Sequence, residues 1–163
     1  MKPILLCGPS GCGKSTRIQQ LARQAGGPIY GFLTRKETDG HIYIYPAGVS
    51  GEPSPLTPAA PCSQNRVGEL ISAEKRLARP RPEVFDGPGV ALLSDIPVGA
   101  LVIMDELGIL ESEAHVFRAK VLEVMQGPYR VLAALKDADT PFLNQVRALG
   151  EIRPAFGLGN RTP

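Results

Sequence analysis

The chain has 163 residues and a formal net charge of +2 at pH 7. This length fits one compact domain, residues 1–163, whose core needs no disulfide or structural metal to fold. A charge so near zero does not favour nucleic acid as a partner, because nucleic-acid-binding domains usually carry a clustered basic face. The three cysteines lack the Cys-x-x-Cys spacing of a zinc site. We therefore expect reduced cysteines and a cytoplasmic location. No apolar run in the sequence reaches the roughly 18 residues that a membrane-spanning helix needs.

The first predicted unit is a strand, a loop and a helix. Residues 4–7 form a short apolar run, as in a strand that is buried on both faces of a parallel sheet. Residues 8–15 form a glycine-rich loop. Residues 14–24 have the apolar spacing of a helix, which we expect to end at Gly26-Gly27-Pro28.

The middle of the chain departs from a simple alternation of strands and helices. Residues 29–34 and 41–45 are predicted strands, and Asp39-Gly40 between them is a hairpin signal, so we expect an inserted antiparallel β-hairpin. The prolines of residues 46–61 predict an irregular surface loop. Residues 67–75 fit either a strand or a helix. Residues 83–95 predict a short helix that Gly87-Pro88-Gly89 interrupts.

The rest of the chain alternates again. Residues 101–104 and 129–135 are predicted buried strands, residues 151–156 a final strand, and Thr140-Pro141 a helix start. The alternation predicts an α/β three-layer fold with a mainly parallel sheet, whose ligands bind at the carboxyl ends of the strands. Residues 112–125 are a predicted helix with four inward-facing side chains: Val116, Ala119, Leu122 and Val124.

Residues 8–15, here called the phosphate loop, match the Walker A pattern G-x-x-x-x-G-K-[ST] at every fixed position. The match follows a predicted strand and precedes a predicted helix, which is the context that the motif requires. Glycines allow the loop to turn its backbone N–H groups inward, and the helix adds its free N–H groups and positive dipole end. The predicted nucleotide-binding residues are Gly8, Pro9, Ser10, Gly11, Cys12, Gly13, Lys14, Ser15 and Thr16.

Three of these side chains have predicted contacts with a bound nucleoside triphosphate. Lys14 reaches the β- and γ-phosphates as a point charge, Ser15 offers its hydroxyl to Mg²⁺, and Thr16 contacts the α-phosphate. A nucleoside triphosphate such as ATP or GTP is therefore the expected substrate, with Mg²⁺ as cofactor.

Two carboxylates follow the apolar run 101–104. Asp105, at the end of a strand beside the phosphate loop, can hold Mg²⁺ through water, and Glu106 can polarise the attacking water. An Asp-Glu pair at this point is typical of P-loop NTPases of the RecA type, in which a third strand separates the two motif strands. The sequence has no Asn-Lys-x-Asp motif for reading guanine.

Other charged residues have simpler interpretations. Glu111 and Glu113 are expected to stabilise the start of the next helix through its dipole. Neither His41 nor His115 has a metal partner at a suitable spacing. The basic residues within 17–23 are expected on a solvated helix face, whereas those within 75–81 could steer an anionic ligand.

Taken together, these motifs make the sequence resemble the nucleoside-triphosphatase family of the thermophile type. The members of this family are small P-loop NTPases like the cancer-related nucleoside-triphosphatase. The phosphate loop lies near the start of the chain, and residues 31–37 (GFLTRKE) resemble the family's Gly-Phe-x-Thr strand. Residues 103–111 (IMDELGILE) resemble its Asp-Glu-Ile-Gly segment, although Ile109 stands where the family has lysine. Asn160-Arg161 resembles an Asn-Arg pair near the family's C-terminus.

The resemblance implies a RecA-type sheet and Mg²⁺-dependent hydrolysis of the β–γ bond of ATP, GTP and other triphosphates, with broad base specificity. It also implies that Thr34 and Arg35 lie near the nucleotide, and that Arg161 stabilises charge or contacts the base. A cation must face the γ-phosphate during hydrolysis. Arg161, Arg35 and Lys136 are the candidates; Lys136 follows a core strand towards the same edge.

Two other functions remain open at the level of sequence. A small-molecule or nucleotide kinase would use a similar loop, and the basic residues 76–81 could form its lid. A nucleotide-dependent adaptor module with little turnover would use the hairpin and the proline-rich loop as contact surfaces. We expect a monomer or weak oligomer with no membrane contact, and a protein partner is left open.

Overall fold

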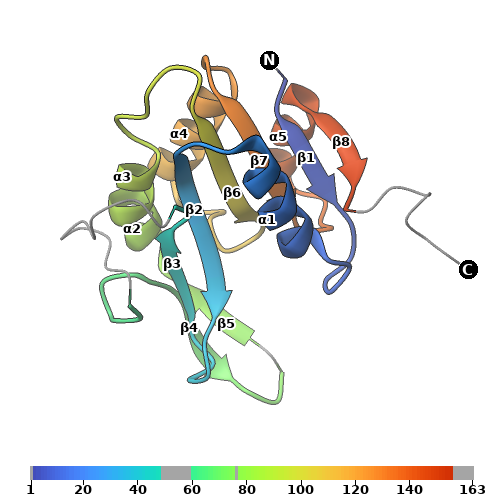
Figure 1. Ribbon diagram of the computed structural model, residues 1–163. Helices are drawn as coiled ribbons and strands as arrows, with labels where there is room; N and C mark the ends of the chain where they lie inside the picture. Colours follow the sequence, from blue (N-terminus) through green and yellow to red (C-terminus); the bar gives the residue numbers. More distant parts are fainter. Residues whose placement is uncertain (1, 49–59, 76, 156–163) are drawn as a thin grey trace, which may run out of the picture.

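The structure, a computed structural model, describes residues 2–48, 60–75 and 77–155. In this part of the chain, eight strands form one sheet in the order β5-β4-β3-β2-β6-β7-β1-β8 (Figure 1). Five strands run parallel: β2 (Ile29–Lys36), β6 (Leu101–Leu107), β7 (Arg130–Leu135), β1 (Ile4–Cys7) and β8 (Glu151–Pro154). Three antiparallel strands extend the sheet beyond β2: β3 (Ile42–Pro46), β4 (Arg66–Ser72) and β5 (Leu77–Pro80).

The strand order confirms the expected RecA-type arrangement. Strand β7 lies between β1, which leads into the phosphate loop, and β6, which carries the two acids. The predicted β2–β3 hairpin is also confirmed, with Thr34 opposite Ile44 in the antiparallel ladder. Because β1, β6 and β2 are all parallel, their carboxyl ends and the residues that follow them meet at one edge of the sheet.

Helices cover both faces of the sheet. Helix α1 (Lys14–Ala25) packs on one face, where its Ile18 and Ala22 join Leu101 and Ile103 of β6 in one apolar cluster. The alternate residues of β6 face the other side and belong to a second, larger cluster, as the two-residue period of a strand requires. The elements on that side are α2 (Pro82–Val84), η1 (Phe85–Gly89), α3 (Val90–Leu92), α4 (His115–Met125) and α5 (Pro141–Leu149).

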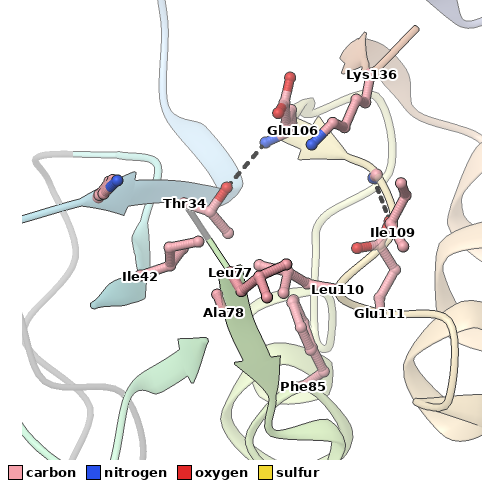
Figure 2. Close-up of a pocket in the computed structure, with 12 residues that line it drawn as sticks. Thr34, Ile42, Leu77, Ala78, Phe85, Glu106, Ile109, Leu110, Glu111 and Lys136 are labelled. Carbon is pink, nitrogen blue, oxygen red and sulfur yellow. Dashed lines mark hydrogen bonds between the residues drawn. The ribbon is translucent and has the colours of Figure 1, made fainter. Parts of the chain in front are cut away.

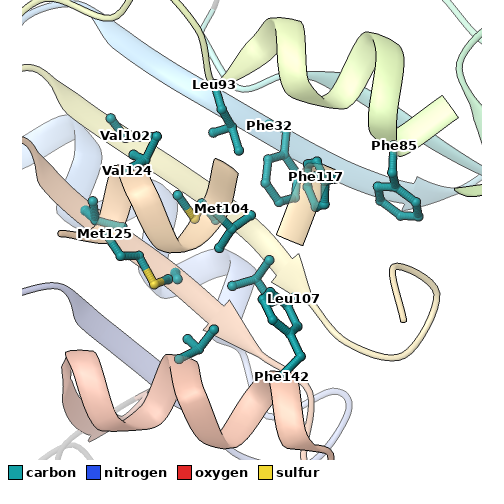
Figure 3. Packing of buried hydrophobic residues seen from close by; sticks show 14 of the residues in the cluster. Phe32, Phe85, Leu93, Val102, Met104, Leu107, Phe117, Val124, Met125 and Phe142 are labelled. Atoms are coloured by element: carbon teal, nitrogen blue, oxygen red, sulfur yellow. The ribbon is translucent and has the colours of Figure 1, made fainter. Parts of the chain in front are cut away.

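Three phenylalanines from β2, η1 and α4 pack together in this larger cluster (Figure 3). The ring of Phe117 on α4 lies 5.3 Å from that of Phe32 on β2 and 5.0 Å from that of Phe85 on η1, between ring centroids. Burying each ring contributes about 1.5–3 kcal/mol to folding. This packing fixes β2 against the helical layer, and β2 in turn borders the strand that carries the two acids.

The predicted inward face of helix α4 was correct for Val124 and Leu122 but wrong for Val116 and Ala119, which are exposed. The helix begins at His115 and buries Phe117, Val121, Val124 and Met125, whereas Val116 is 58% exposed. The buried set recurs every three to four residues, as one face of a helix must, and the bulky Phe117 selects that face. Asp86 also accepts a hydrogen bond from the backbone N–H of Phe117 at 2.9 Å, so a residue distant in sequence caps the helix start.

Residues 83–95 also differ from expectation, because Gly87-Pro88-Gly89 does not interrupt the helix. The turn Phe85–Gly89 is π-helical and joins α2 to α3. A π turn uses hydrogen bonds between residues five apart, and Pro88, which has no N–H to donate, lies inside this turn. Gly89 allows a close approach to α4, since a Cβ there would lie 2.9 Å from a ring atom of Phe117.

The ambiguous residues 67–75 belong to a second hairpin, β4–β5, which the sequence did not reveal. Part of the basic segment 75–81 forms the edge strand Leu77–Pro80. Arg81 is held by ion pairs to Glu69 at 3.3 Å and Glu83 at 2.8 Å. This segment is thus strand, not the lid that a kinase would need. Among the described helices, none is long and apolar enough to cross a membrane.

Candidate functional site

The phosphate loop connects β1 to α1 and takes a conformation that needs its glycines. Gly8, Gly11 and Gly13 have positive φ angles of 152°, 79° and 95°. A Cβ on Gly8 would also lie 2.7 Å from the sulfur of Cys12. The sequence prediction of a tight, glycine-dependent turn between a strand and a helix is therefore confirmed, and the first residues of α1 face the space that the loop encloses.

Lys14, the first residue of α1, is buried under this loop. Its Nζ donates hydrogen bonds to the backbone oxygens of Gly8 at 2.7 Å and Leu135 at 3.1 Å. The same Nζ lies 3.7 Å from Oε2 of Glu106. Contacts to the residue that follows β1, to β7 and to β6 thus hold the ammonium group at the carboxyl edge of the sheet. The charge, together with the start of a helix, can bind an anion there.

Asp105 lies near the carboxyl end of β6 and is also buried. Burial raises the pKa of its carboxyl group, because desolvation disfavours the charged form. Three interactions oppose this rise and lower the pKa of Asp105. They are a hydrogen bond from the Ser15 side chain and the positive charges of Arg35 and Lys14. The Ser15 hydroxyl and the Asp105 carboxylate are a pair of oxygen donors that fit Mg²⁺, which binds through one or two protein oxygens, waters and phosphates.

Glu106 is 37% exposed and follows Asp105 in β6. Its backbone N–H donates to Oγ1 of Thr34 at 3.3 Å (Figure 2). The Thr34 hydroxyl in turn donates to the backbone oxygen of Asp105 at 3.3 Å. Thr34 of β2 therefore links the two acids of β6 from the neighbouring strand. The geometry leaves the carboxylate of Glu106 near Lys14 and open to solvent.

These groups line a single cleft of about 410 Å³, which is large enough for a small polar ligand. The cleft brings together most of the residues that the sequence singled out. Its lining residues are Ser10, Gly11, Gly13, Lys14, Ser15, Thr16, Thr34, Asp105 and Glu106. Arg161 lies outside the described residues.

A protein-family model with the description NTPase matches residues 3–155. The chain belongs to the NTPase family. The structure also resembles that of THEP1 from the hyperthermophile Aquifex aeolicus, with a TM-score of 0.73 and 19% identity over 98% of this chain and 92% of that one. A human cancer-related nucleoside triphosphatase is similar too, with a TM-score of 0.62 and 18% identity over 94% of this chain and 87% of that one. No curated protein matches.

The glycine that opens the segment Gly31-Phe32-Leu33-Thr34 of this NTPase has a clear structural reason. Gly31 of β2 has a φ of +101°, and a Cβ at this position would lie 1.9 Å from the backbone oxygen of Ile103. Only glycine lets β2 approach β6 this closely. The approach sets Thr34 beside the two acids.

Glu111 of the NTPase does not have the role that the sequence suggested. Helix α4 starts only at His115 and has no acid in its first turn, so Glu111 does not stabilise its dipole. Instead Glu111 is 2% exposed and accepts a hydrogen bond from the backbone N–H of Gly108. Burial raises the pKa of Glu111 to about 7, although the backbone N–H groups of Gly108 and Glu111 oppose this rise. The buried carboxyl group fixes the turn that follows Glu106.

Two of the three candidate cations lie in the described part of the NTPase. Arg35 is exposed on β2 and acts on the charge of Asp105. Lys136 directly follows β7, is exposed, and lines a cavity next to the phosphate-binding cleft together with Glu106. The prediction that Lys136 points towards the same edge of the sheet as Glu106 is therefore correct.

The sequence missed the backbone oxygen of Leu135, which accepts a hydrogen bond from Lys14. A main-chain oxygen has no signature in a sequence, but the neighbouring positions of β7 and β1 bring it there.

Proposed function

We propose that this chain is a Mg²⁺-dependent nucleoside triphosphatase that hydrolyses the β–γ bond of ATP, GTP and other triphosphates to the diphosphate and phosphate. The observation that carries the proposal is the 3.7 Å separation of Lys14 Nζ and Glu106 Oε2 within one cleft. This juxtaposition combines a cation for the phosphates with a carboxylate for the nucleophile. Membership of the NTPase family supports the same activity.

The phosphate loop would hold the triphosphate. Backbone N–H groups of the loop and the start of α1 bind the phosphate oxygens, and Lys14 lies against the β- and γ-phosphates. Ser15 and Asp105 would hold Mg²⁺, which supplies positive charge to the phosphate oxygens when bound. Thr16 at the helix start contacts the α-phosphate.

Glu106 would orient the attacking water. The water oxygen forms a bond to the γ-phosphorus, and the bond from that phosphorus to the β–γ bridging oxygen breaks, with its electron pair leaving on the diphosphate. Glu106 accepts the hydrogen bond of the water and then its proton. Thr34 holds the backbone of Glu106 in place from β2, so the carboxylate needs little reorganisation as the reaction proceeds.

Negative charge builds up on the oxygens of the transferred phosphoryl group, and Lys14 neutralises only part of this charge. A second cation can contribute a factor of about 10³ or more to such reactions. Lys136 and Arg35 lie at the same edge of the sheet, and Arg161 is the third candidate. Comparing the alanine variants of all three would identify the group that acts.

The lining of the cleft, as far as the described residues form it, supports the proposed broad base specificity. Its residues belong to the phosphate loop, the start of α1, β2 and the end of β6. None of them is an aromatic residue that could stack on a base. Recognition through phosphates and metal would accept ATP, GTP, CTP and UTP alike.

The test is phosphate release from these four triphosphates, with and without Mg²⁺, by the wild type and by Glu106→Gln. We expect Mg²⁺-dependent release from all four by the wild type, and nucleotide binding without release by the variant. Release without an added acceptor distinguishes a hydrolase from a kinase. Tight binding with no release by the wild type would instead support the adaptor module, and equal release by both proteins would exclude Glu106 from the mechanism.

A further inference from the structure

A second cavity of about 380 Å³ adjoins the phosphate-binding cleft (Figure 2). The two share Thr34 and Glu106 as lining residues. The additional walls come from the inserted strands β3 and β5, from η1 and from the turn at residues 108–111. The inserted strands therefore supply one wall of the cavity, and the turn that follows Glu106 supplies another.

This cavity has an apolar end and a polar end. Figure 2 shows Thr34, Glu106 and Lys136 on one side, while Leu77, Ala78, Phe85 and Leu110 gather opposite them. A water molecule that attacks a phosphate needs only one small polar position. The volume lies instead in the range of sites that bind small organic molecules, which are mostly apolar with a few convergent polar groups. Hydrolysis alone does not account for the apolar end.

The charges around the cavity favour an anionic group on the ligand. Glu106 is compensated by Lys14 at 3.7 Å, and buried Glu111 is bound to the backbone N–H of Gly108. Lys36 and Lys136 are exposed and line the same cavity. Within the described residues, neither lysine forms an ion pair with a carboxylate. Two uncompensated cations beside an apolar wall fit an amphipathic acid.

We propose that this cavity is a second ligand site for a small organic anion with an apolar body of one or two rings, or an alkyl chain of similar size. The apolar body lies against Leu77, Phe85 and Leu110, and the charged group lies near Lys36 and Lys136. The diphosphate-bound protein is its preferred state, because no γ-phosphate then repels the anion. In the triphosphate-bound protein, the ligand excludes the attacking water beside Glu106 and slows hydrolysis.

The probe is 8-anilinonaphthalene-1-sulfonate, which has an apolar ring system, a sulfonate and a fluorescence that rises in apolar surroundings. Its binding is measured in saturating MgADP, which fills the phosphate-binding cleft. We expect saturable binding at one site, lost in Ala78→Trp, which fills the apolar end. The control is Val98→Trp, which adds the same ring at a residue that is 79% exposed and does not line the cavity. Displacement of the probe by MgADP, or unchanged binding to Ala78→Trp, would overturn the proposal.

A second variant keeps the test decisive if Ala78→Trp fails to fold. Lys36→Gln alters only an exposed side chain, and we expect it to raise the dissociation constant of the probe roughly tenfold, as loss of a charged partner does. An unchanged dissociation constant in this variant would show that Lys36 does not attract the sulfonate, which would contradict the proposal.

The effect on turnover rests on the proposed function, whereas binding of the probe does not. The probe should lower phosphate release by the wild type in a way that saturating MgATP weakens but does not abolish, because the γ-phosphate repels the anion without occupying its site. Val98→Trp should be equally sensitive to the probe. Absence of phosphate release with normal probe binding would overturn the proposed function alone. Normal release with no saturable probe binding would overturn the second ligand site alone.

Discussion

At the scale of single residues, hydrogen bonds between side chains and the backbone fix the functional groups of the site. Lys14 is fixed by two backbone oxygens, and Glu106 is fixed through its own backbone by Thr34. The proposed nucleophile-orienting carboxylate is therefore positioned by a hydroxyl on a different strand. Removing that hydroxyl should affect the chemical step more than the binding of nucleotide.

We predict that Thr34→Val lowers kcat about tenfold with little change in KM. Valine keeps the shape of threonine but leaves the N–H of Glu106 without its acceptor, which costs about 1–1.5 kcal/mol of positioning. Steady-state phosphate release measures both constants. Thr38→Val, an exposed threonine in the hairpin turn, is the matched control. A rise in KM at constant kcat would show that Thr34 acts on binding instead.

Glu111 gives a prediction about stability and pH. Its pKa rises from 4.5 to about 7 on folding because burial disfavours the charge, so the folded protein retains a proton that the unfolded chain has lost. The protonated carboxyl group therefore favours folding most fully below about pH 4.5. Its contribution is lost as the pH rises through 7, by up to about 3 kcal/mol in total.

Replacing Glu111 by glutamine should remove this dependence, because glutamine can still accept the N–H of Gly108 but cannot ionise. Urea unfolding of the wild type and Glu111→Gln at several values between pH 5 and pH 8 tests this. We expect the wild type to lose stability relative to the variant as the pH rises. Parallel curves across that range would mean that Glu111 stays ionised in the folded protein.

At the scale of elements, the close contact between β2 and β6 sets the geometry of the site. Gly31 makes this contact possible, so Gly31→Ala should lower the free energy of unfolding by at least about 3 kcal/mol, through backbone strain and collision with Ile103. Gly87→Ala is the control, since a Cβ there meets nothing within 4 Å. Denaturant unfolding compares the two, and similar small losses in both would show that β2 can shift without cost.

The elements also show what could be predicted from the sequence. The unit of β1, phosphate loop and α1, and the apolar strand that leads to Asp105 and Glu106, carry local signals: apolar runs, glycines and acids at fixed spacing. The β4–β5 hairpin carries none, because residues 67–75 mix apolar and polar positions without one period. The start of α4 depends on the hydrogen bond from Phe117 to the distant Asp86, and the burial of Glu111 results from tertiary packing. Sequence periodicity reports neither.

At the scale of the whole molecule, the phosphate-binding cleft joins segments that are far apart in the chain. The loop and α1 come from the N-terminal end, Thr34 from β2, and the two acids from β6. A ligand that contacts all of these binds the folded state and not the unfolded chain. Nucleotide binding should therefore stabilise the entire protein against unfolding.

At a free concentration about 100 times its dissociation constant, MgATP should add about 2.7 kcal/mol to the free energy of unfolding of Glu106→Gln, which binds without hydrolysing. For a chain of 163 residues, this corresponds to a rise in Tm of roughly 5–10 °C. Lys14→Ala should show almost no rise at the same concentration, because the phosphates lose the cation held beneath the loop. Arg23→Ala, an exposed residue of the same helix, should keep the full rise. An equal rise in Lys14→Ala would place the nucleotide elsewhere on the molecule.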